Sequence, residues 1–592
     1  MIPDWLRLPY LMWIDVFKYA SAPLDEREHV DWLLATSRVC RAFAEPCLTA
    51  LYQCPPLLTR SMAHNLVALL KRDPSTTAYK YRQKVEKLRV DVQEIAAKTF
   101  RGQMLDFGAL IACTPRLQVI DFTHEKDLPP FRSLDDSLRW HYPDAMFEAL
   151  NGIRPAGESE AAPTKLIGWR WNRRLMGPNT DPSRIKSLHL TLAFANVKKL
   201  SLINYQVPSL RYAGKAVSPI TQGADEAFIQ DIAQAISSLP VLDYLSVESS
   251  TIVNDDFLSL LPKSLKFLEL INCWEVSGED FTGYLLSHGQ KLEHIVLRHN
   301  QSLSLAFLTV MESGCPNLKT LSVDLKNYNH HEFYNDSDPN YAEVLTVDQV
   351  PKWPETLEWI ELRNMKKWSA EAAEVLFQSL VDSAPTLPHL RHLDLKTMLD
   401  IPFRQRSALR DKWDAKLKRV FLRKKVDPKP FFSLRKAAVV TGVEITKVAT
   451  KSPRKKARVV TASESEARRS SRIATHASNP SSRDSSLGRD PRAVRARPSY
   501  AEVDTDADDE DNEPEALEES EKSEPESEKN ASDAEEDIFR HGMCDTVDIQ
   551  LDNQKLAEIT WQMDDFLDVE ASDNPSDEDW DGDDHADGGY AW

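Results

Sequence analysis

Aromatic and charged residues recur between aliphatic residues in the middle of this 592-residue chain, and their types suit contacts with another protein. They are Tyr244, Phe267, Glu269, His294, Arg298, Trp359, Glu361, Arg363 and His392. Aromatic and arginine side chains are the ones that most often anchor protein interfaces. Both signs of charge are mixed among them, whereas a nucleic-acid groove would need a basic stripe. The set indicates a protein-binding surface and no specific nucleic acid, and the alternative is a solvated strand face with incidental aromatic residues.

Sequence patterns that build common catalytic sites are missing. The chain contains no G-x-x-x-x-G-K-[ST], G-x-S-x-G or H-E-x-x-H, and glycine is scarce at 18 residues. Its 7 cysteines form no C-x-x-C pair, which argues for a reducing compartment over a disulfide framework. We therefore expect a protein that is not an enzyme and has no cofactor and no metal centre.

The candidate residues lie within copies of an aliphatic-x-x-aliphatic-x-aliphatic pattern, which marks the structural elements that position them. Its clear copies begin at Leu265, Leu292, Leu318, Leu357 and Leu390, and its weaker copies at Val85, Leu117, Leu166, Val197 and Leu242. Amphipathic helical stretches, such as residues 225–239, 277–289 and 369–384, lie between copies. A strand and a helix in alternation predict a leucine-rich-repeat solenoid, with a parallel sheet on the concave face and helices outside. Because side chains alternate along a strand, the candidate residues then face the concave surface.

Three short helices are expected near the start of the chain, over residues 9–19, 27–36 and 38–51. Their apolar side chains are too many for the core of so small a unit, so some are expected to contact a partner or the neighbouring solenoid. Asp4, Arg7, Asp15 and Lys18 interrupt the apolar opening, and no run long enough for a membrane span follows. We expect no membrane contact.

This helical unit resembles the F-box. Leu8 and Pro9 match the family's opening pair, Val16 and Phe17 its aliphatic-Phe pair, and the block from Val39 through Cys40 to Phe43 its central motif. Leu51 and Tyr52 stand where the family closes with Leu and an aromatic residue. The resemblance implies docking onto the adaptor subunit of a cullin–RING ubiquitin ligase. The residues expected to bind the adaptor are Leu8, Pro9, Ile14, Val16, Phe17, Val39, Cys40, Phe43, Leu51 and Tyr52.

The composition changes sharply near residue 425. Beyond it, Ser, Pro and charged residues dominate, first with a basic excess and then an acidic one, and such sequence cannot bury enough apolar surface to fold. Lys451, Arg454, Lys455, Lys456 and Arg458 form a basic cluster typical of a nuclear-import signal. Within the acidic part, residues 543–553 alternate like a strand, which predicts addition to a sheet edge of the solenoid or to another protein.

The expected architecture is thus α/β. Residues 1–60 form the F-box module, 61–400 the solenoid, 401–425 an amphipathic capping helix, and 426–592 a long disordered tail. The resemblance implies a substrate-recognition subunit of an SCF-type ubiquitin ligase, which binds an adaptor and through it a cullin, and takes an unknown protein substrate. An import receptor is a further expected partner, with a nuclear location or one shared with the cytoplasm. The alternative is a nuclear leucine-repeat protein with an acidic tail that binds chromatin or histones and has no ligase role.

Overall fold

A single parallel β-sheet is the central element of the fold. The structure is a computed structural model, and it describes residues 8–22, 24, 26–128, 138–154, 161–177, 181–212, 219–327, 338–399, 401–424 and 539–553. Eleven strands pair in one sheet, in the order in which they occur along the chain. They are β1 (Lys87–Asp91), β2 (Val119–Thr123), β3 (Gly168–Asn172), β4 (Lys199–Ile203), β5 (Tyr244–Glu248), β6 (Phe267–Ile271), β7 (His294–Arg298), β8 (Thr320–Asp324), β9 (Trp359–Met365), β10 (His392–Leu399) and β11 (Thr546–Asn553). Every neighbouring pair is parallel.

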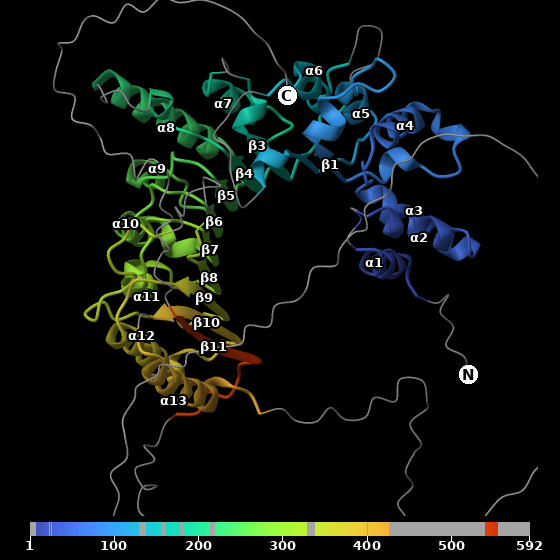
Figure 1. Cartoon of the computed structure of the whole chain (residues 1–592). Helices are drawn as coiled ribbons and strands as arrows, with labels where there is room; N and C mark the ends of the chain where they lie inside the picture. Colours follow the sequence, from blue (N-terminus) through green and yellow to red (C-terminus); the bar gives the residue numbers. More distant parts are fainter. Residues whose placement is uncertain are drawn as a thin grey trace, which may run out of the picture. The chain divides into compact units, whose positions relative to one another are not determined.

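Helices and turns connect the strands and cover one face of the sheet (Figure 1). The helices are α1 (Tyr10–Ala20), α2 (Arg27–Ser37), α3 (Arg41–Gln53), α4 (Arg60–Lys71), α5 (Phe107–Ala112), α6 (Asp144–Leu150), α7 (Ser183–His189), α8 (Pro219–Ser237), α9 (Asp255–Ser259), α10 (Gly278–His288), α11 (Met311–Gly314), α12 (Ala370–Asp382) and α13 (Phe403–Phe421). The chain is therefore an α/β protein in which N-terminal helices precede a leucine-rich-repeat-like parallel sheet. The expectation of a disordered tail concerns residues that lie mostly outside the described ranges.

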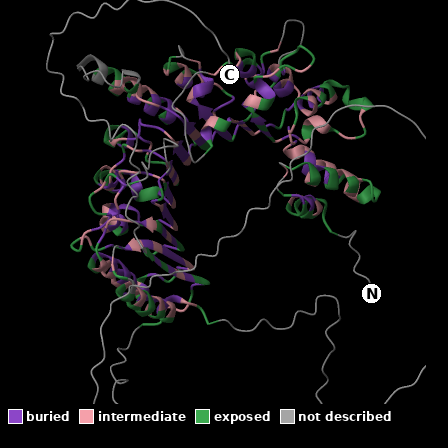
Figure 2. Ribbon diagram, viewed as in Figure 1, coloured by how far each residue is buried: buried purple, intermediate pink, exposed green. Residues whose placement is uncertain are grey.

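The positions of strands β1 to β10 follow the aliphatic pattern in the sequence. Each strand begins two residues after one of the ten expected copies, from Val85 before β1 to Leu390 before β10. These starting residues are all buried, as are the second and fourth residues of the strands. The strand residues between them point to the other face of the sheet, which none of the helices in the described residues covers and which we call the open face (Figure 1). Figure 2 shows buried residues concentrated along the sheet.

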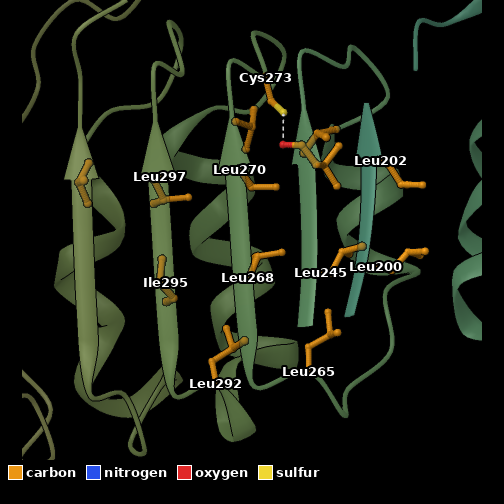
Figure 3. Close-up of a cluster of buried hydrophobic side chains, with 14 of the residues drawn as sticks. Leu200, Leu202, Leu245, Leu265, Leu268, Leu270, Cys273, Leu292, Ile295 and Leu297 are labelled. Atoms are coloured by element: carbon orange, nitrogen blue, oxygen red, sulfur yellow. Dashed lines mark hydrogen bonds between the residues drawn. The ribbon is translucent and has the colours of Figure 1, made fainter. Parts of the chain in front are cut away.

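The buried side chains stack from one repeat to the next. Leu245, Leu268 and Ile295 occupy the same register position on β5, β6 and β7, and Figure 3 shows them as one row of the core. The Cys273 thiol is fully buried and donates to the Val247 carbonyl oxygen at 3.5 Å. Cys315 is also fully buried, and burial raises the pKa of its thiol to about 12. Both cysteines therefore serve the core as small apolar side chains.

Left-handed residues turn the chain out of several strands. Asn204, Ser249, Asn272 and His299 directly follow β4 to β7, and their φ angles lie between 49° and 61°. Asparagine and histidine adopt this conformation more readily than most residues, and it costs a branched side chain the most. The backbone N–H of Asn272 donates to the backbone carbonyl oxygen of Arg298, on the next strand, at 2.8 Å. The turn therefore continues the strand-to-strand hydrogen bonding one residue beyond the strands.

Helix starts follow local capping chemistry. Ser277 and Asp280 form a reciprocal capping box at the start of α10, as the acidic residue three positions after the serine predicts. At α12 the Ser369 hydroxyl accepts a hydrogen bond from the Ala372 amide, without an acidic partner. Both helices begin one residue after the expected serine.

The far end of the sheet is closed by two segments that are distant in the sequence. β11 adds to β10 over eight paired residues, and the buried Val547, Ile549 and Leu551 of β11 join the main core. The same core contains Trp413 and Phe421 of α13. The strand-like residues 543–553 therefore add to the sheet of their own chain.

Candidate protein-binding surfaces

Helices α1, α2 and α3 form a small module with its own core. The core contains Ile14, Phe17, Val30, Leu33, Cys47, Ala50 and Leu51. The Phe43 ring, half-buried, lies 4.8 Å from the Trp13 ring and 5.4 Å from the Phe17 ring between centroids. These contacts hold the start of α3 against α1.

The structure buries three of the residues expected to bind an adaptor. Ile14, Phe17 and Leu51 are 4–6% exposed, because they make the core that holds the three helices together. Tyr52 is half-buried and lies 4.7 Å from the Tyr81 ring, at the junction with the first repeat. These four side chains support the module in the structure of the chain alone, and their contact with an adaptor stays a prediction.

The other expected residues are accessible. Leu8 is 36% exposed, Val16 45% and Val39 72%, and Pro9 and Cys40 are exposed as well. Val39 and Cys40 lie directly before α3, whose Phe43 ring contacts α1. Phe43 itself is half-buried. Part of the predicted set thus forms an exposed apolar surface.

Helix α1 extends this surface with residues that the sequence analysis did not select. Leu11 is 70% exposed, Met12 52% and Tyr19 87%. Met12, Val16 and Tyr19 are spaced by four and three residues within α1, so they lie on one face of the helix, which we call the outer face. Leu8 precedes the helix. Ile14 and Phe17 lie on the opposite, buried side. The sequence signal for this second apolar face is the spacing of Met12, Val16 and Tyr19, which lies opposite the apolar stripe of Ile14 and Phe17.

All nine substrate candidates lie on the open face of the sheet. Each is half-buried or exposed, while its neighbours along the strand are mostly buried. Because the strands pair in register, the structure brings them into rows that cross the sheet. Tyr244, Phe267, His294, Trp359 and His392 are all first residues of their strands, Glu269 and Glu361 are third residues, and Arg298 and Arg363 are fifth residues.

Hydrogen bonds and ion pairs fix the charged rows. The Tyr244 hydroxyl donates to Glu269 Oε2 at 2.6 Å, and burial followed by this bond raises the pKa of the tyrosine. Arg363 Nη1 lies 2.9 Å from Glu361 Oε1, and its Nε donates to Asp394 Oδ2 at 2.9 Å. The Ser322 hydroxyl donates to Glu361 Oε2 at 2.7 Å. The open face is therefore an ordered polar surface in which side chains hold one another in place.

In the described part of the chain, no three His, Cys, Asp or Glu side chains gather in a way that could hold a metal ion. None of the helices in the described ranges combines the length and apolar character needed to span a lipid bilayer. The expected import signal, from Lys451 to Arg458, lies outside the described residues.

Comparisons with known proteins give only distant structural matches. No family model matches the sequence, and no curated protein does either. Among solved structures, a chain from the crystal structure of the Rad7 and Elc1 complex in yeast is 13% identical, with a TM-score of 0.26 over 59% of this chain and 92% of that one. A protein from Bacteroides fragilis is 11% identical, with a TM-score of 0.18 over 39% of this chain. The match spans 64% of that protein, less than two thirds of its length.

Proposed function

We propose that this chain is the substrate-recognition subunit of an SCF-type cullin–RING ubiquitin ligase. Its N-terminal module would bind the ligase adaptor through the outer face of α1 together with Val39 and Cys40, and its open face would bind a target protein. The leucine-rich-repeat fold is typically a non-catalytic scaffold. Such a receptor contributes proximity, because it holds a lysine of the target near a ubiquitin-loaded enzyme supplied by the rest of the assembly.

The observation that carries this proposal is the presence of two apolar faces on α1. The inner face, with Ile14 and Phe17, completes the core of the module. The outer face, with Met12, Val16 and Tyr19, is 45–87% exposed although these side chains are largely apolar. Contiguous exposed apolar surface on a folded module indicates a protein-binding site. The F-box resemblance supplies the kind of partner, an adaptor with an apolar groove.

Co-purification of the full-length chain with a ligase adaptor tests the proposal. Val16→Asp and Val39→Asp place charges on the exposed surface without touching the core, and each is expected to reduce recovered adaptor and cullin at least about tenfold, because a charge would be desolvated in the interface. Leu8→Ala combined with Pro9→Ala is expected to weaken recovery less severely. Leu286→Asp, at a 52% exposed leucine on α10, is the matched control and should leave recovery unchanged.

The same experiment separates the alternative. Recovery of histones without adaptor would support the chromatin-binding role and overturn the ligase role. Adaptor recovery that Val16→Asp and Val39→Asp leave intact would overturn the proposed docking surface. We also propose nuclear import through the cluster from Lys451 to Arg458. Lys455→Ala combined with Lys456→Ala should leave a fluorescent fusion of the chain in the cytoplasm. Unchanged nuclear fluorescence would contradict the proposed import signal.

A further inference from the structure

One row of the open face is almost entirely aromatic. The first residues of β4 to β10 pair in register across the sheet, so their side chains stand in a line. In order they are Lys199, Tyr244, Phe267, His294, Thr320, Trp359 and His392. Thr320 on β8 is the small residue between two groups of rings.

The rings on each side of Thr320 are stacked. Tyr244 and Phe267 lie 4.3 Å apart, and Phe267 and His294 5.3 Å apart, with interplanar angles of 28° and 29°. Trp359 and His392 lie 3.5 Å apart with an angle of 10°. Since each ring is stacked on its neighbour across the sheet, His294 and Trp359 turn their other faces toward Thr320. The row therefore contains a gap with an aromatic face on each side.

The gap is wide enough for one flat group. β7 and β9 both pair with β8, so His294 and Trp359 are separated by two strand spacings, or about 9–10 Å. A planar group above Thr320 would lie about 5 Å from each ring, within the range of a cation–π contact. Trp359 is 41% exposed, so its ring is accessible to a binding partner.

The row already holds one cation in this manner. Lys199 Nζ lies 5.4 Å from the centroid of the Tyr244 ring, at the other end of the first stack. Tryptophan is the best cation–π ring, and a neutral imidazole does not repel a cation. Burial is the largest cause that lowers the pKa of His294, so this ring is neutral at pH 7. Both faces of the gap can therefore accept a positive group.

Charged side chains of both signs surround the gap. The strands from β6 to β10 and the residue just before each of them carry six carboxylates and six cations, which are Glu269, Glu293, Asp324, Glu358, Glu361 and Asp394, and Lys266, Arg298, Lys319, Arg363, Arg391 and Lys396. Lys319, next to Thr320, is held by Glu293, with Nζ 2.7 Å from Oε2. Glu358, next to Trp359, is exposed. The exposed carboxylate of Glu358, beside Trp359, favours a cation over a neutral aromatic ring.

We propose that the gap above Thr320 binds the guanidinium of an arginine side chain from a bound protein segment, stacked between His294 and Trp359. A guanidinium is flat and stacks on aromatic rings, whereas a lysine ammonium is compact and strongly hydrated. This inference rests on the proposed function, because it names a chemical feature of the target that the open face would select.

The test uses the full-length chain labelled with 5-fluorotryptophan, in which the Trp359 fluorine signal is identified by its loss in Trp359→Phe. Nα-acetyl-arginine N-methylamide is titrated in, and the citrulline compound, of the same shape but uncharged, is the matched ligand control. A saturable shift of the Trp359 signal is expected with the arginine compound. Thr320→Phe fills the gap and should weaken the apparent affinity at least about tenfold, whereas Thr320→Val keeps the gap and the affinity.

Three results would overturn the proposal: an equal shift with citrulline, tighter binding of the corresponding phenylalanine compound, or arginine binding that Thr320→Phe leaves unchanged. Adaptor recovery by the same variants keeps the two proposals distinct. Arginine binding without adaptor recovery would refute the ligase role and still support the arginine site above Thr320. Adaptor recovery without arginine binding would refute the gap alone.

Discussion

The Cys544 thiol donates to the Leu390 carbonyl oxygen at 3.5 Å, although 154 residues separate them in the sequence. His541 lies 2.6 Å from the Leu387 carbonyl oxygen over the same separation. Next to these contacts β11 pairs with β10, and its apolar residues join the core shared with α13. A segment near residue 550 therefore completes the repeat domain.

Loss of an apolar side chain on β11 should loosen the last repeat. Ile549 is 5% exposed, and Ile549→Ala is expected to cost about 2–4 kcal/mol, because it leaves a cavity beside the core. Hydrogen–deuterium exchange should show faster exchange of the β10 amides in this variant. Gln550→Ala, at an exposed neighbour on the same strand, is the control. Unchanged protection of β10 in Ile549→Ala would mean that β11 does not stabilise the sheet.

The repeat architecture was predictable because its signal is local. Aliphatic residues at fixed offsets mark each strand, and even the weaker copy at Val197 precedes β4 by two residues. Alternation at Val547, Ile549 and Leu551 marks a strand as well. The partner of that strand could not be predicted, because a local pattern does not indicate which exposed strand it will pair with.

The module surface was harder to predict for a different reason. Ile14, Val16 and Phe17 are neighbours in sequence and all apolar, yet Val16 is 45% exposed and the other two are buried. Hydrophobicity alone cannot assign the two sides of a helix that is apolar on both. The gap above Thr320 was also hidden, because it exists only when the register of β7, β8 and β9 places three first residues side by side.

The buried His189 predicts a fall in stability at acidic pH. The Trp171 indole N–H donates to His189 Nε2 at 2.8 Å, and His189 Nδ1 lies 2.7 Å from the Ala235 carbonyl oxygen. Because Nε2 accepts, the ring is neutral and its proton is on Nδ1. Burial lowers the pKa of His189 from 6.5 to about 4.

The unfolded chain therefore binds a proton on this histidine more readily between pH 6.5 and pH 4. The stabilisation is full above pH 6.5 and is lost as the pH falls to about 4, by about 3 kcal/mol. Urea unfolding at pH 7 and pH 4.5 measures it. His189→Gln, which keeps a neutral acceptor for Trp171, should be less stable at pH 7 and lose less on acidification. Equal losses in both proteins would contradict the assignment.

The buried pair of Arg174 and Asp127 predicts a large effect from removing one partner. Arg174 contacts one oxygen of Asp127, and Asn172 Nδ2 donates to the other at 2.6 Å. Arg174→Met would leave a buried carboxylate without its cation, at an expected cost of about 3–5 kcal/mol at pH 7. Asp127→Asn added to Arg174→Met should recover part of this loss, which urea unfolding can measure.

The pH dependence of the Arg174→Met variant has a definite sign. Burial raises the pKa of Asp127, and Arg174 opposes that rise. Without Arg174 the pKa of the folded state rises further, so the folded variant takes up a proton more readily than the unfolded chain. Its deficit should shrink as the pH falls from 7 to 5. A deficit that is the same at both values would show that the carboxylate is not what destabilises the variant.

Cysteine reactivity offers a test of the module surface in the unaltered protein. Cys40 is exposed directly before α3, whereas Cys47 is 1% exposed and burial raises the pKa of its thiol to about 12. The thiolate is the reactive form, so N-ethylmaleimide should modify Cys40 well before Cys47 in the folded chain. Binding of the ligase adaptor should slow the modification of Cys40 about tenfold or more, as measured by mass spectrometry of the peptide that contains it, because the adaptor would cover the thiol. A Cys40 that reacts as fast in the adaptor complex as in the free chain would place the contact elsewhere on the module.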